Sequence, residues 1–460
     1  MTLPSPSSAA DDPIVAIATP PGRGAIGVIR ISGRRALAVA STIVRLDRPG
    51  GLVAAPSRRV LRARIVEPDT GAPLDEALVV AMPGPRSYTG QDVVELSCHG
   101  NPILLAEIVG RLVAAGARLA APGEFTRRAY LNGRLDLVQA EAVAELIAAR
   151  TDRAVRLAAR QLRGTLASEI GMLREWLLDL VAGLEVALDF PEDEIGLSRP
   201  DALKRVLELA AGLEALAAGA RRGRAIQEGL RLVLTGTPNV GKSSLLNALL
   251  GAERAIVSPA PGTTRDLVEG ELVIAGIAVR LVDGAGLGAP SDAIDAEGMR
   301  RARTAVAESD LVVVVLDRSR PLGSADLDIL AFTEARERLL VANKSDLPAV
   351  WDEPSIEACV CSAVTGAGLD HLRDRIREWV ERRTAADGDE GGIVASLRVV
   401  ESLDRAVSLL RHAAAEMESV PFEAVLVDLR EALTTLGQTL GLEADDAVLD
   451  RIFSRFCVGK

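Results

Sequence analysis

The pattern of hydrophobic and polar positions gives the first 120 residues a texture of their own. Short apolar runs alternate with turn clusters rich in Gly and Pro, which is typical of strands joined by tight turns. An apolar segment with helical spacing, Pro102–Ala115, follows these runs. We therefore expect an α+β domain here. The predicted strands are Ile14–Ala18, Gly27–Ile31, Ala77–Ala81 and Asp92–Leu96.

Two later regions, from about Gln139 to Ala220 and from about Ile393 to Phe456, repeat their apolar positions at helical spacing. They are expected to form long helices. Between them lies a compact alternation of apolar runs and helical segments. Because insertion is tolerated where chain ends lie close together at a surface, we expect one helical domain with an α/β domain inserted into it. The acidic, Gly-rich stretch Ala385–Gly392 is the expected exit linker.

The inserted region begins with a phosphate-binding pattern. Leu230–Thr235 predicts a buried strand, residues 236–243 match G-x-x-x-x-G-K-S, and Ser244–Leu250 supplies the helix that must follow. In such a loop backbone N–H groups curl around phosphates, Lys242 reaches the β and γ oxygens, and the Ser243 hydroxyl ligates Mg²⁺. The residues expected to contact the nucleotide here are Asn239, Val240, Gly241, Lys242, Ser243 and Ser244.

A second motif, D-x-x-G, ends the strand that closes at Asp283. Asp283 is expected to hold a metal-bound water, and the Gly286 N–H to contact the γ-phosphate. Switch proteins of the Ras type place a water-orienting Gln directly after this motif, but this chain has Leu287. An apolar side chain cannot polarise water, so hydrolysis needs another group.

The base is expected to bind at N-K-x-D, formed by Asn343, Lys344 and Asp346 after the predicted strand Leu339–Ala342. The Asp carboxylate accepts two hydrogen bonds from the N1/N2 edge of guanine, a pattern that adenine cannot offer. Ser362 and Ala363, after the next strand, are expected to back the base. These motifs in this order predict a GTP-hydrolysing enzyme.

The fold class predicted from these patterns is multidomain α/β, with a Ras-like P-loop GTPase domain inserted into an all-helical domain. The expected boundaries are 1–128 for the N-terminal α+β domain, 129–228 and 384–460 for the two parts of the helical domain, and 229–383 for the GTPase domain.

Composition narrows the setting and the partners. The net charge is −11, but residues 1–128 contain 15 Arg and only 11 Asp and Glu, so the whole-chain charge does not exclude a basic face for RNA. Apolar runs such as Leu311–Leu316 are far too short to cross a bilayer, so we expect no membrane partner. Only four of the 53 basic residues are Lys, and three of these four, Lys242, Lys344 and Lys460, fall within motifs. At those three positions we expect the compact ammonium to serve chemistry rather than charge alone.

The four cysteines show no paired framework, which fits a reducing compartment, and we expect a cytoplasmic protein. Cys359 and Cys361 alternate in an apolar stretch, Ala358–Ala363, that predicts a strand. We expect one of these thiols to be buried and the other partly exposed. Cys457 is a lone cysteine in an apolar segment near the C-terminus, and such a residue usually serves only as a small side chain for packing.

The last residues, 453–460, end in F-C-[hydrophobic]-G-K, and with an inserted GTPase domain they make this chain resemble the MnmE (TrmE) family of tRNA-modification GTPases. The resemblance covers essentially the whole chain. Further stretches that carry it are 19–24, 30–33, 87–90, 122–126, 131–137, 139–142, 189–192 and 429–432.

The resemblance implies a function. Proteins of this family work with the flavoprotein MnmG, as a heterotetramer, to add an aminomethyl or carboxymethylaminomethyl group at C5 of the tRNA wobble uridine. The one-carbon unit comes from 5,10-methylene- or 5-formyl-tetrahydrofolate, and FAD enters only through the partner. The N-terminal domain is expected to bind folate and to form a homodimer, and the GTPase to be activated by K⁺.

The resemblance also assigns metal ligands. Asn239, whose bare sequence context allows either a turn-stabilising role or a cation ligand, resembles the family's K⁺ ligand, and Ser258, Ala260 and Thr263 are expected to complete the shell. Thr264 resembles the switch threonine that joins Ser243 on Mg²⁺. Ser258, Thr263 and Thr264 are thus also expected at the GTP site.

In the N-terminal domain the family's folate contacts match Arg30, Glu95, Arg134 and Lys460. Positive side chains suit the glutamate carboxylates of folate, and a Glu can accept from pterin N–H groups. The family's cysteine matches Cys457, and our hypothesis is a functional thiol in tRNA modification.

Three departures from the family pattern affect the site. Gly284 replaces the usual Thr in D-T-A-G, and Arg134 stands where members often have Lys. The catalytic glutamate aligns with Asp295, one methylene shorter, with Glu297 as a nearby competitor. Two other functions stay open on these residues, a ribosome-assembly type of GTPase that acts only by binding RNA, and a structural GTPase whose N-terminal domain has lost folate.

Overall fold

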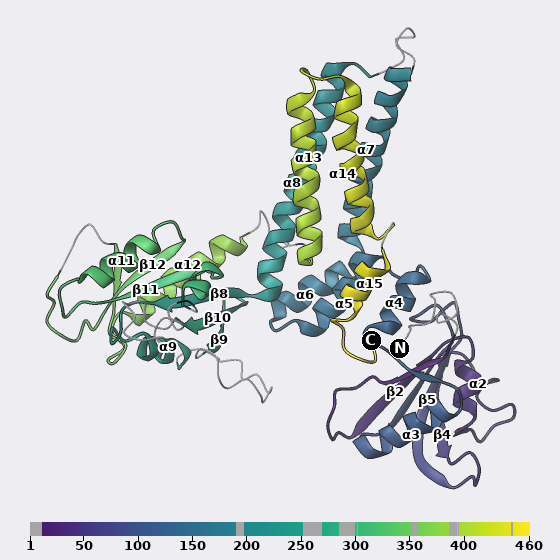
Figure 1. Cartoon of the computed structure of the whole chain (residues 1–460). Helices are drawn as coiled ribbons and strands as arrows, with labels where there is room; N and C mark the ends of the chain where they lie inside the picture. The colour runs from purple at the N-terminus through teal and green to yellow at the C-terminus, as the bar shows by residue number, and fades with distance from the viewer. Residues whose placement is uncertain are drawn as a thin grey trace. The chain divides into compact units, whose positions relative to one another are not determined.

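The computed structural model describes residues 12–189, 197–251, 269–284, 300, 302–351, 357–385, 393, 395–442 and 445–460. These residues form two compact units, each built from several stretches of the chain (Figure 1). The first unit comprises 1–144, 162–206 and 409–460, and the second comprises 145–161 and 207–408. Helical segments on either side of the nucleotide motifs contribute to both units.

The first unit contains a seven-stranded sheet with the order β3-β4-β5-β6-β2-β1-β7. Its pairs are antiparallel except for β1 with β7. The helices α2 and α3 share one hydrophobic cluster with this sheet, so its apolar face is covered. The elements are β1 (Ile14–Ile17), β2 (Ile26–Ser32), α2 (Ala36–Ser41), β3 (Val44–Arg45), β4 (Val60–Val66), β5 (Pro73–Met82), β6 (Val93–His99), α3 (Pro102–Ala114) and β7 (Arg118–Leu119).

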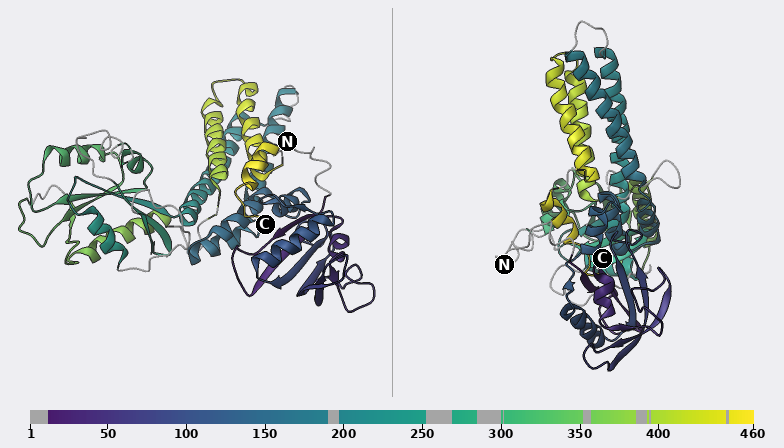
Figure 2. Two further views of the ribbon diagram at one scale, coloured as in Figure 1. Left: turned by 60° about the horizontal axis from the view of Figure 1, so that its bottom comes forward. Right: turned by 90° about the vertical axis from the view of Figure 1, so that its right-hand side faces the viewer.

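The helices that follow this sheet and those near the C-terminal end of the chain are divided between the two units. The long helices α7 and α14 run side by side, as both views of Figure 2 and the closeness of their backbones show. The helices are α4 (Glu124–Leu131), α5 (Leu137–Ala148), α6 (Asp152–Gln161), α7 (Thr165–Asp189), α8 (Arg199–Glu228), α13 (Leu397–Glu416), α14 (Phe422–Leu440) and α15 (Asp446–Phe453). In the part of the chain described, no helix combines the length and the apolar character needed to cross a membrane.

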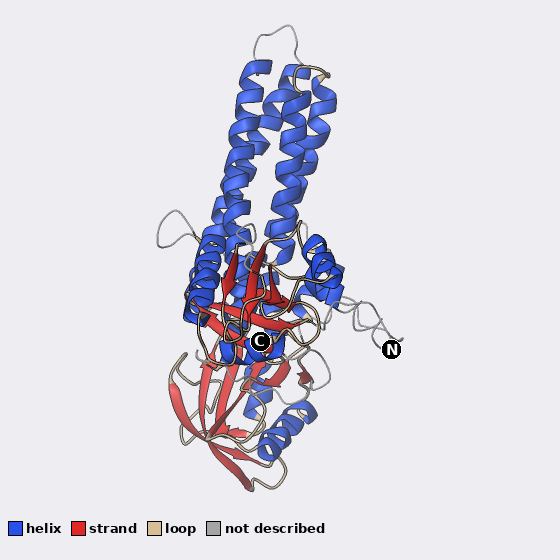
Figure 3. Cartoon of the chain, turned by 90° about the vertical axis from the view of Figure 1, so that its left-hand side faces the viewer, coloured by secondary structure: helices blue, strands red, loops and turns tan. Residues whose placement is uncertain are grey.

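The second unit contains a six-stranded sheet with the order β13-β12-β11-β8-β10-β9, in which only the β9–β10 pair is antiparallel. Apolar clusters cover both of its faces, one including α9 and α12 and the other α11. Figure 3 shows the strands of both sheets in red among the helices. The elements are β8 (Leu230–Thr235), α9 (Lys242–Leu250), β9 (Glu269–Ile274), β10 (Ile277–Asp283), β11 (Leu311–Asp317), α11 (Ser324–Phe332), β12 (Arg338–Asn343), β13 (Ala358–Val360) and α12 (Leu369–Thr384).

These findings confirm the predicted fold class of a multidomain α/β chain. The cysteine prediction in the second unit is wrong, because Cys359 and Cys361 are both buried, 4% and 0% exposed. Side chains two positions apart in a strand point to the same face, so both thiols face inward while Val360 between them is exposed. Beyond it the Cys361 N–H donates to the Ala342 carbonyl at 3.0 Å, and the thiol joins the same apolar cluster as Cys359.

Candidate functional site

The phosphate-binding pattern forms the turn between β8 and α9. β8 is an inner strand, so its carboxyl end opens at the edge of the sheet where β10, β11 and β12 also end. Gly241 has φ +96°, and a Cβ there would lie 2.4 Å from Asn343 Nδ2. Asn239 also adopts a left-handed conformation, with φ +64°. The loop thus needs residues that tolerate positive φ, as backbone wrapped around an anion does.

Lys242, the first residue of α9, turns its ammonium back into this loop. Its Nζ donates to the carbonyl oxygens of Gly236 at 3.1 Å and Thr237 at 3.0 Å. Burial lowers the pKa of Lys242, and the nearby negative charge of Asp283 opposes that effect only in part. An anionic phosphate beside the ammonium would supply the missing counter-charge, because opposite charge favours the protonated form.

Ser243 and Asp283 supply oxygens that suit Mg²⁺. The Ser243 hydroxyl donates to Asp283 Oδ2 at 2.6 Å, which brings the ends of α9 and β10 together. Asp283 Oδ1 is buried and has no hydrogen-bond partner among the residues described. A hydroxyl and a carboxylate are hard oxygen ligands of the kind Mg²⁺ takes, together with water and phosphate. The residues present therefore fit this metal.

Asn343 connects the phosphate loop to the loop after β13. Its Nδ2 donates to the Val240 carbonyl at 2.8 Å, and its Oδ1 accepts from the Ala363 N–H at 3.0 Å. The Ser362 hydroxyl donates to the Asp346 carboxylate, which fixes that side chain on the same edge. The structure therefore brings the phosphate loop together with the two segments that the sequence assigned to guanine recognition.

Asp317, which the sequence reasoning missed, lies within this site. It ends β11, pairs in register with Asn343 on β12, and accepts from Lys344 Nζ at 2.6 Å. Burial raises the pKa of Asp317, but hydrogen bonds from Lys344 and Ser319 outweigh it and the pKa falls below its usual range. The sequence did contain a signal for it, because Asp317 is an acidic residue directly after the apolar run Leu311–Leu316.

The remaining expected residues differ in what the structure says of them. Val240 is buried and Ser244 is exposed on the first turn of α9. The expected site residues outside the part of the chain that the structure describes are Ser258, Ala260, Thr263, Thr264, Gly286 and Asp295. Leu287, Glu297 and residues 386–392 of the expected exit linker lie outside it as well.

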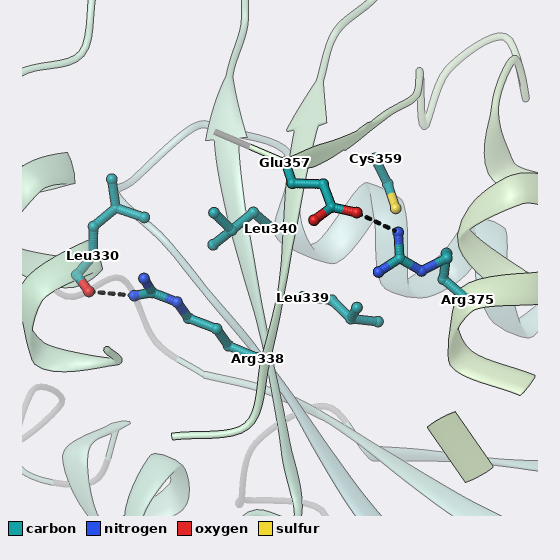
Figure 4. Close-up of a pocket in the computed structure, with 7 residues that line it drawn as sticks. All are labelled: Leu330, Arg338, Leu339, Leu340, Glu357, Cys359 and Arg375. Atoms are coloured by element: carbon teal, nitrogen blue, oxygen red, sulfur yellow. Dashed lines mark hydrogen bonds and ion pairs between the residues drawn. The ribbon is translucent and has the colours of Figure 1, made fainter. Parts of the chain in front are cut away.

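A cavity of about 300 Å³ lies at the other end of the same strands (Figure 4). Arg338 begins β12 and Glu357 directly precedes β13, so the cavity opens at the amino ends of strands whose carboxyl ends carry the nucleotide motifs. Arg375 and Glu357 form an ion pair across it at 3.5 Å. The cavity is lined by Leu330, Arg338, Leu339, Leu340, Glu357, Cys359 and Arg375, and none of these belongs to a nucleotide motif.

A second cluster of predicted site residues forms in the first unit. Arg30 on β2 pairs in register with Glu95 on β6. Its Nε and Nη2 lie 2.8 Å and 2.7 Å from Glu95 Oε1, and its Nη1 donates to the Gly459 carbonyl at 3.0 Å. The guanidinium carbon also stands 5.8 Å and 5.7 Å from the ring centroids of Tyr88 and Phe125. One arginine thus holds the sheet, two rings and the C-terminal segment together.

The C-terminal segment follows β1 closely. A Cβ at Gly459, which has φ +96°, would lie 2.6 Å from the Ile17 carbonyl oxygen. Burial and the charge of Arg30 lower the pKa of Lys460, while Glu95 raises it, so the ammonium lies in the same electrostatic environment as the pair. Cys457 is exposed, three residues before the end of the chain.

Arg134 is placed beside this cluster rather than within it. Its Cγ would lie 3.4 Å from a Cβ at Gly90. Gly90 belongs to the loop that carries Tyr88, one of the rings against Arg30. The structure therefore brings three of the four residues into one electrostatic cluster and sets the fourth at its neighbouring loop.

Family models and known proteins match this chain over almost all of its length. Residues 13–134 match the model for the GTP-binding protein TrmE N-terminus, and residues 137–457 match the model for the MnmE helical domain. The tRNA modification GTPase MnmE of Thermus thermophilus is 45% identical, over 98% of this chain and 99% of its own. Those of Symbiobacterium thermophilum and Moorella thermoacetica are 44% and 41% identical, over 98% of this chain and their full lengths. The chain therefore belongs to the MnmE family of tRNA modification GTPases.

Proposed function

We propose that this GTP-hydrolysing enzyme works with the flavoprotein MnmG to add an aminomethyl or carboxymethylaminomethyl group at C5 of the tRNA wobble uridine. A tetrahydrofolate one-carbon unit supplies the added carbon. The observation that carries the proposal is the meeting of Arg30 and Glu95 with the C-terminal Gly459 and Lys460. GTP hydrolysis alone gives no reason for a C-terminal segment with a thiol to dock on the N-terminal sheet.

In the GTPase domain, proposed as 229–383, Lys242 holds the β and γ phosphates. Ser243 and Thr264 bind Mg²⁺, and Asp283 holds a water that is bound to the metal. Asn239 lies in the phosphate loop with its backbone already left-handed, which supports a role as K⁺ ligand together with Ser258, Ala260 and Thr263. A cation there would offset charge that develops on the phosphates during hydrolysis. Asp295 orients the attacking water, since Leu287 cannot.

In the N-terminal domain, proposed as 1–128, Arg30 and Lys460 bind the carboxylates of the folate and Glu95 accepts from its pterin ring, with Arg134 at the rim. Arg30 and Glu95 are 16% and 29% exposed, so each still presents charge to a ligand while held by the other. Cys457 is exposed and lies three residues before Lys460 in the sequence. Its thiol acts in the modification step. Homodimerisation through this domain and assembly with MnmG belong to the same proposal.

The proposal is tested with the purified full-length chain in two assays. GTP hydrolysis is measured in K⁺ and in Na⁺ at one ionic strength, for the wild type and for Asn239→Ala. We expect stimulation by K⁺ that the variant loses while it still binds GDP. Equal rates in the two salts would contradict the K⁺ assignment.

The second assay is calorimetric titration with 5-formyl-tetrahydrofolate. We expect binding by the wild type and by Arg62→Met, whose arginine lies exposed on the same sheet, but not by Arg30→Met. A protein that hydrolyses GTP but never binds folate would instead be a switch that acts only by binding RNA.

A further inference from the structure

A buried carboxylate lies beneath the phosphate loop, and none of the nucleotide motifs includes it. Asp326 is the third residue of α11 and only 1% exposed. β11 runs parallel to β8, so the loop from Asp317 to α11 leaves the sheet at the edge where the phosphate loop lies. This position lets the β11–α11 loop contact the phosphate loop at the carboxyl edge of the sheet.

Asp326 and Arg320 grip the second residue of the phosphate loop. The Thr237 hydroxyl donates to Asp326 Oδ1 at 2.8 Å and accepts from Arg320 Nη2 at 2.7 Å. Arg320 also donates to both oxygens of Asp326, from Nη1 at 2.9 Å and from Nη2 at 3.0 Å. The three side chains form a closed triangle, and Thr237 is itself 6% exposed.

The same arginine reaches toward the guanine side. Its Nε lies 3.9 Å from Asp317 Oδ2, and that oxygen lies 2.6 Å from Lys344 Nζ. The order of charges from the N-K-x-D loop to the phosphate loop is therefore positive, negative, positive and negative, at Lys344, Asp317, Arg320 and Asp326. Charges that alternate at these distances stabilise one another wherever water is partly excluded.

Helix capping explains only part of this arrangement. Asp326 Oδ2 accepts from the Gly323 N–H at 3.0 Å, as a carboxylate on the first turn of a helix commonly does. Capping does not require a buried hydroxyl on Oδ1, nor an arginine that bonds that hydroxyl as well. The contacts with Thr237 therefore need another reason.

We propose that Arg320, held by Asp326 and Asp317, is a positioning residue that couples the phosphate loop to the guanine-binding loop. The Thr237 carbonyl accepts from Lys242 Nζ, so a fixed Thr237 fixes the direction of the ammonium that meets the phosphates. Through Asp317 the same arginine is linked to Lys344 of N-K-x-D. The inference rests on the guanine-nucleotide site described above, and it adds a second link between the two loops beside the bond from Asn343 to the Val240 carbonyl.

Nucleotide dissociation from the full chain tests this coupling, with a fluorescent N-methylanthraniloyl GDP as the probe. Thr237→Val keeps the shape of the side chain and the cap of α11 but removes the hydroxyl. Thr237→Ser keeps the hydroxyl and removes only the methyl group. Arg320→Gln removes the guanidinium. Arg382→Gln is the matched control, because Arg382 forms an ion pair with Glu337 that is 68% exposed on the arginine side.

We expect Thr237→Val and Arg320→Gln each to release the probe about tenfold faster, the size of one charge-assisted hydrogen bond. The double variant should be hardly faster than either single one, because both break the same triangle. Thr237→Ser should recover most of the loss, and Arg382→Gln should match the wild type.

Additive effects, or a Ser variant as fast as the Val variant, would overturn the inference. So would a folded Thr237→Val protein that releases the probe at the wild-type rate. Failure of the wild type to bind the probe at all is a separate outcome, since it would overturn the guanine-nucleotide site itself.

Discussion

Replacement of Arg30 by Met should loosen the N-terminal sheet far more than the same change at Arg62. Both arginines pair with a Glu on the same sheet at 2.7 Å, but their side chains are 16% and 73% exposed. Exposed ion pairs contribute little because water competes for both charges, whereas sheltered ones leave a poorly solvated partner when broken. The two variants therefore compare a sheltered arginine with an exposed one on the same sheet.

The magnitude at Arg30 follows from what the side chain holds. Hydrogen bonds to a charged group are worth about 1.5–3 kcal/mol, and a cation over aromatic rings adds about 0.5–1 kcal/mol. Glu95 is 29% exposed, so water recovers part of the loss, and the Met side chain keeps part of the packing. We expect a net cost of about 2 kcal/mol, which corresponds to about 30-fold more frequent opening of the sheet.

Native-state hydrogen exchange of the full chain, followed by mass spectrometry, measures this directly. Peptides from β2 and β6 should exchange about 30-fold faster in Arg30→Met under conditions where exchange reports the opening equilibrium. Peptides from β4 and β5, which carry Arg62 and Glu76, should be unchanged in Arg62→Met. Equal losses in the two variants, or no loss in Arg30→Met, would refute the argument from burial.

Three other predictions concern the thiols and the nucleotide site. Cys457 is exposed, while Cys98, Cys359 and Cys361 are buried and burial raises the pKa of Cys98 to about 12. A disulfide reagent at about pH 8 should therefore label one thiol fast in the native protein and none fast in Cys457→Ser. Gly241→Ala places a Cβ 2.4 Å from Asn343 Nδ2 at positive φ, and GDP affinity should fall by about tenfold or more, as equilibrium titration would show. Asp295→Ala should cut GTP turnover strongly with nearly unchanged GDP affinity, and a wild-type turnover rate would place the catalytic group elsewhere.

The sequence predicted the strands near the nucleotide site well because local signals define them. The apolar run Leu230–Thr235 is β8 to the residue, and the predicted strand Leu339–Ala342 lies within β12. Glycines, a lysine and polar turns mark where such strands end, so local patterns alone locate the phosphate loop and the N-K-x-D loop.

The contacts that bind these motifs to one another were not predictable in the same way. Asp326 has the pattern of an ordinary helix-start residue, and nothing local indicates that Thr237, 89 positions away, donates to it. Likewise, Arg30 meets Gly459 across 429 positions, because sheet order and the path of the C-terminal segment are set by tertiary packing. Cys361 was misjudged because residues two apart in a strand share a face, so both thiols point into the same apolar cluster.

The most direct test of the proposed function is nucleoside mass spectrometry of bulk tRNA from cells with and without the gene. We predict that deletion removes the 5-aminomethyl-type wobble uridines, that the wild-type gene restores them, and that Cys457→Ser does not. An unchanged nucleoside profile on deletion would contradict the modification role and leave only the GTPase.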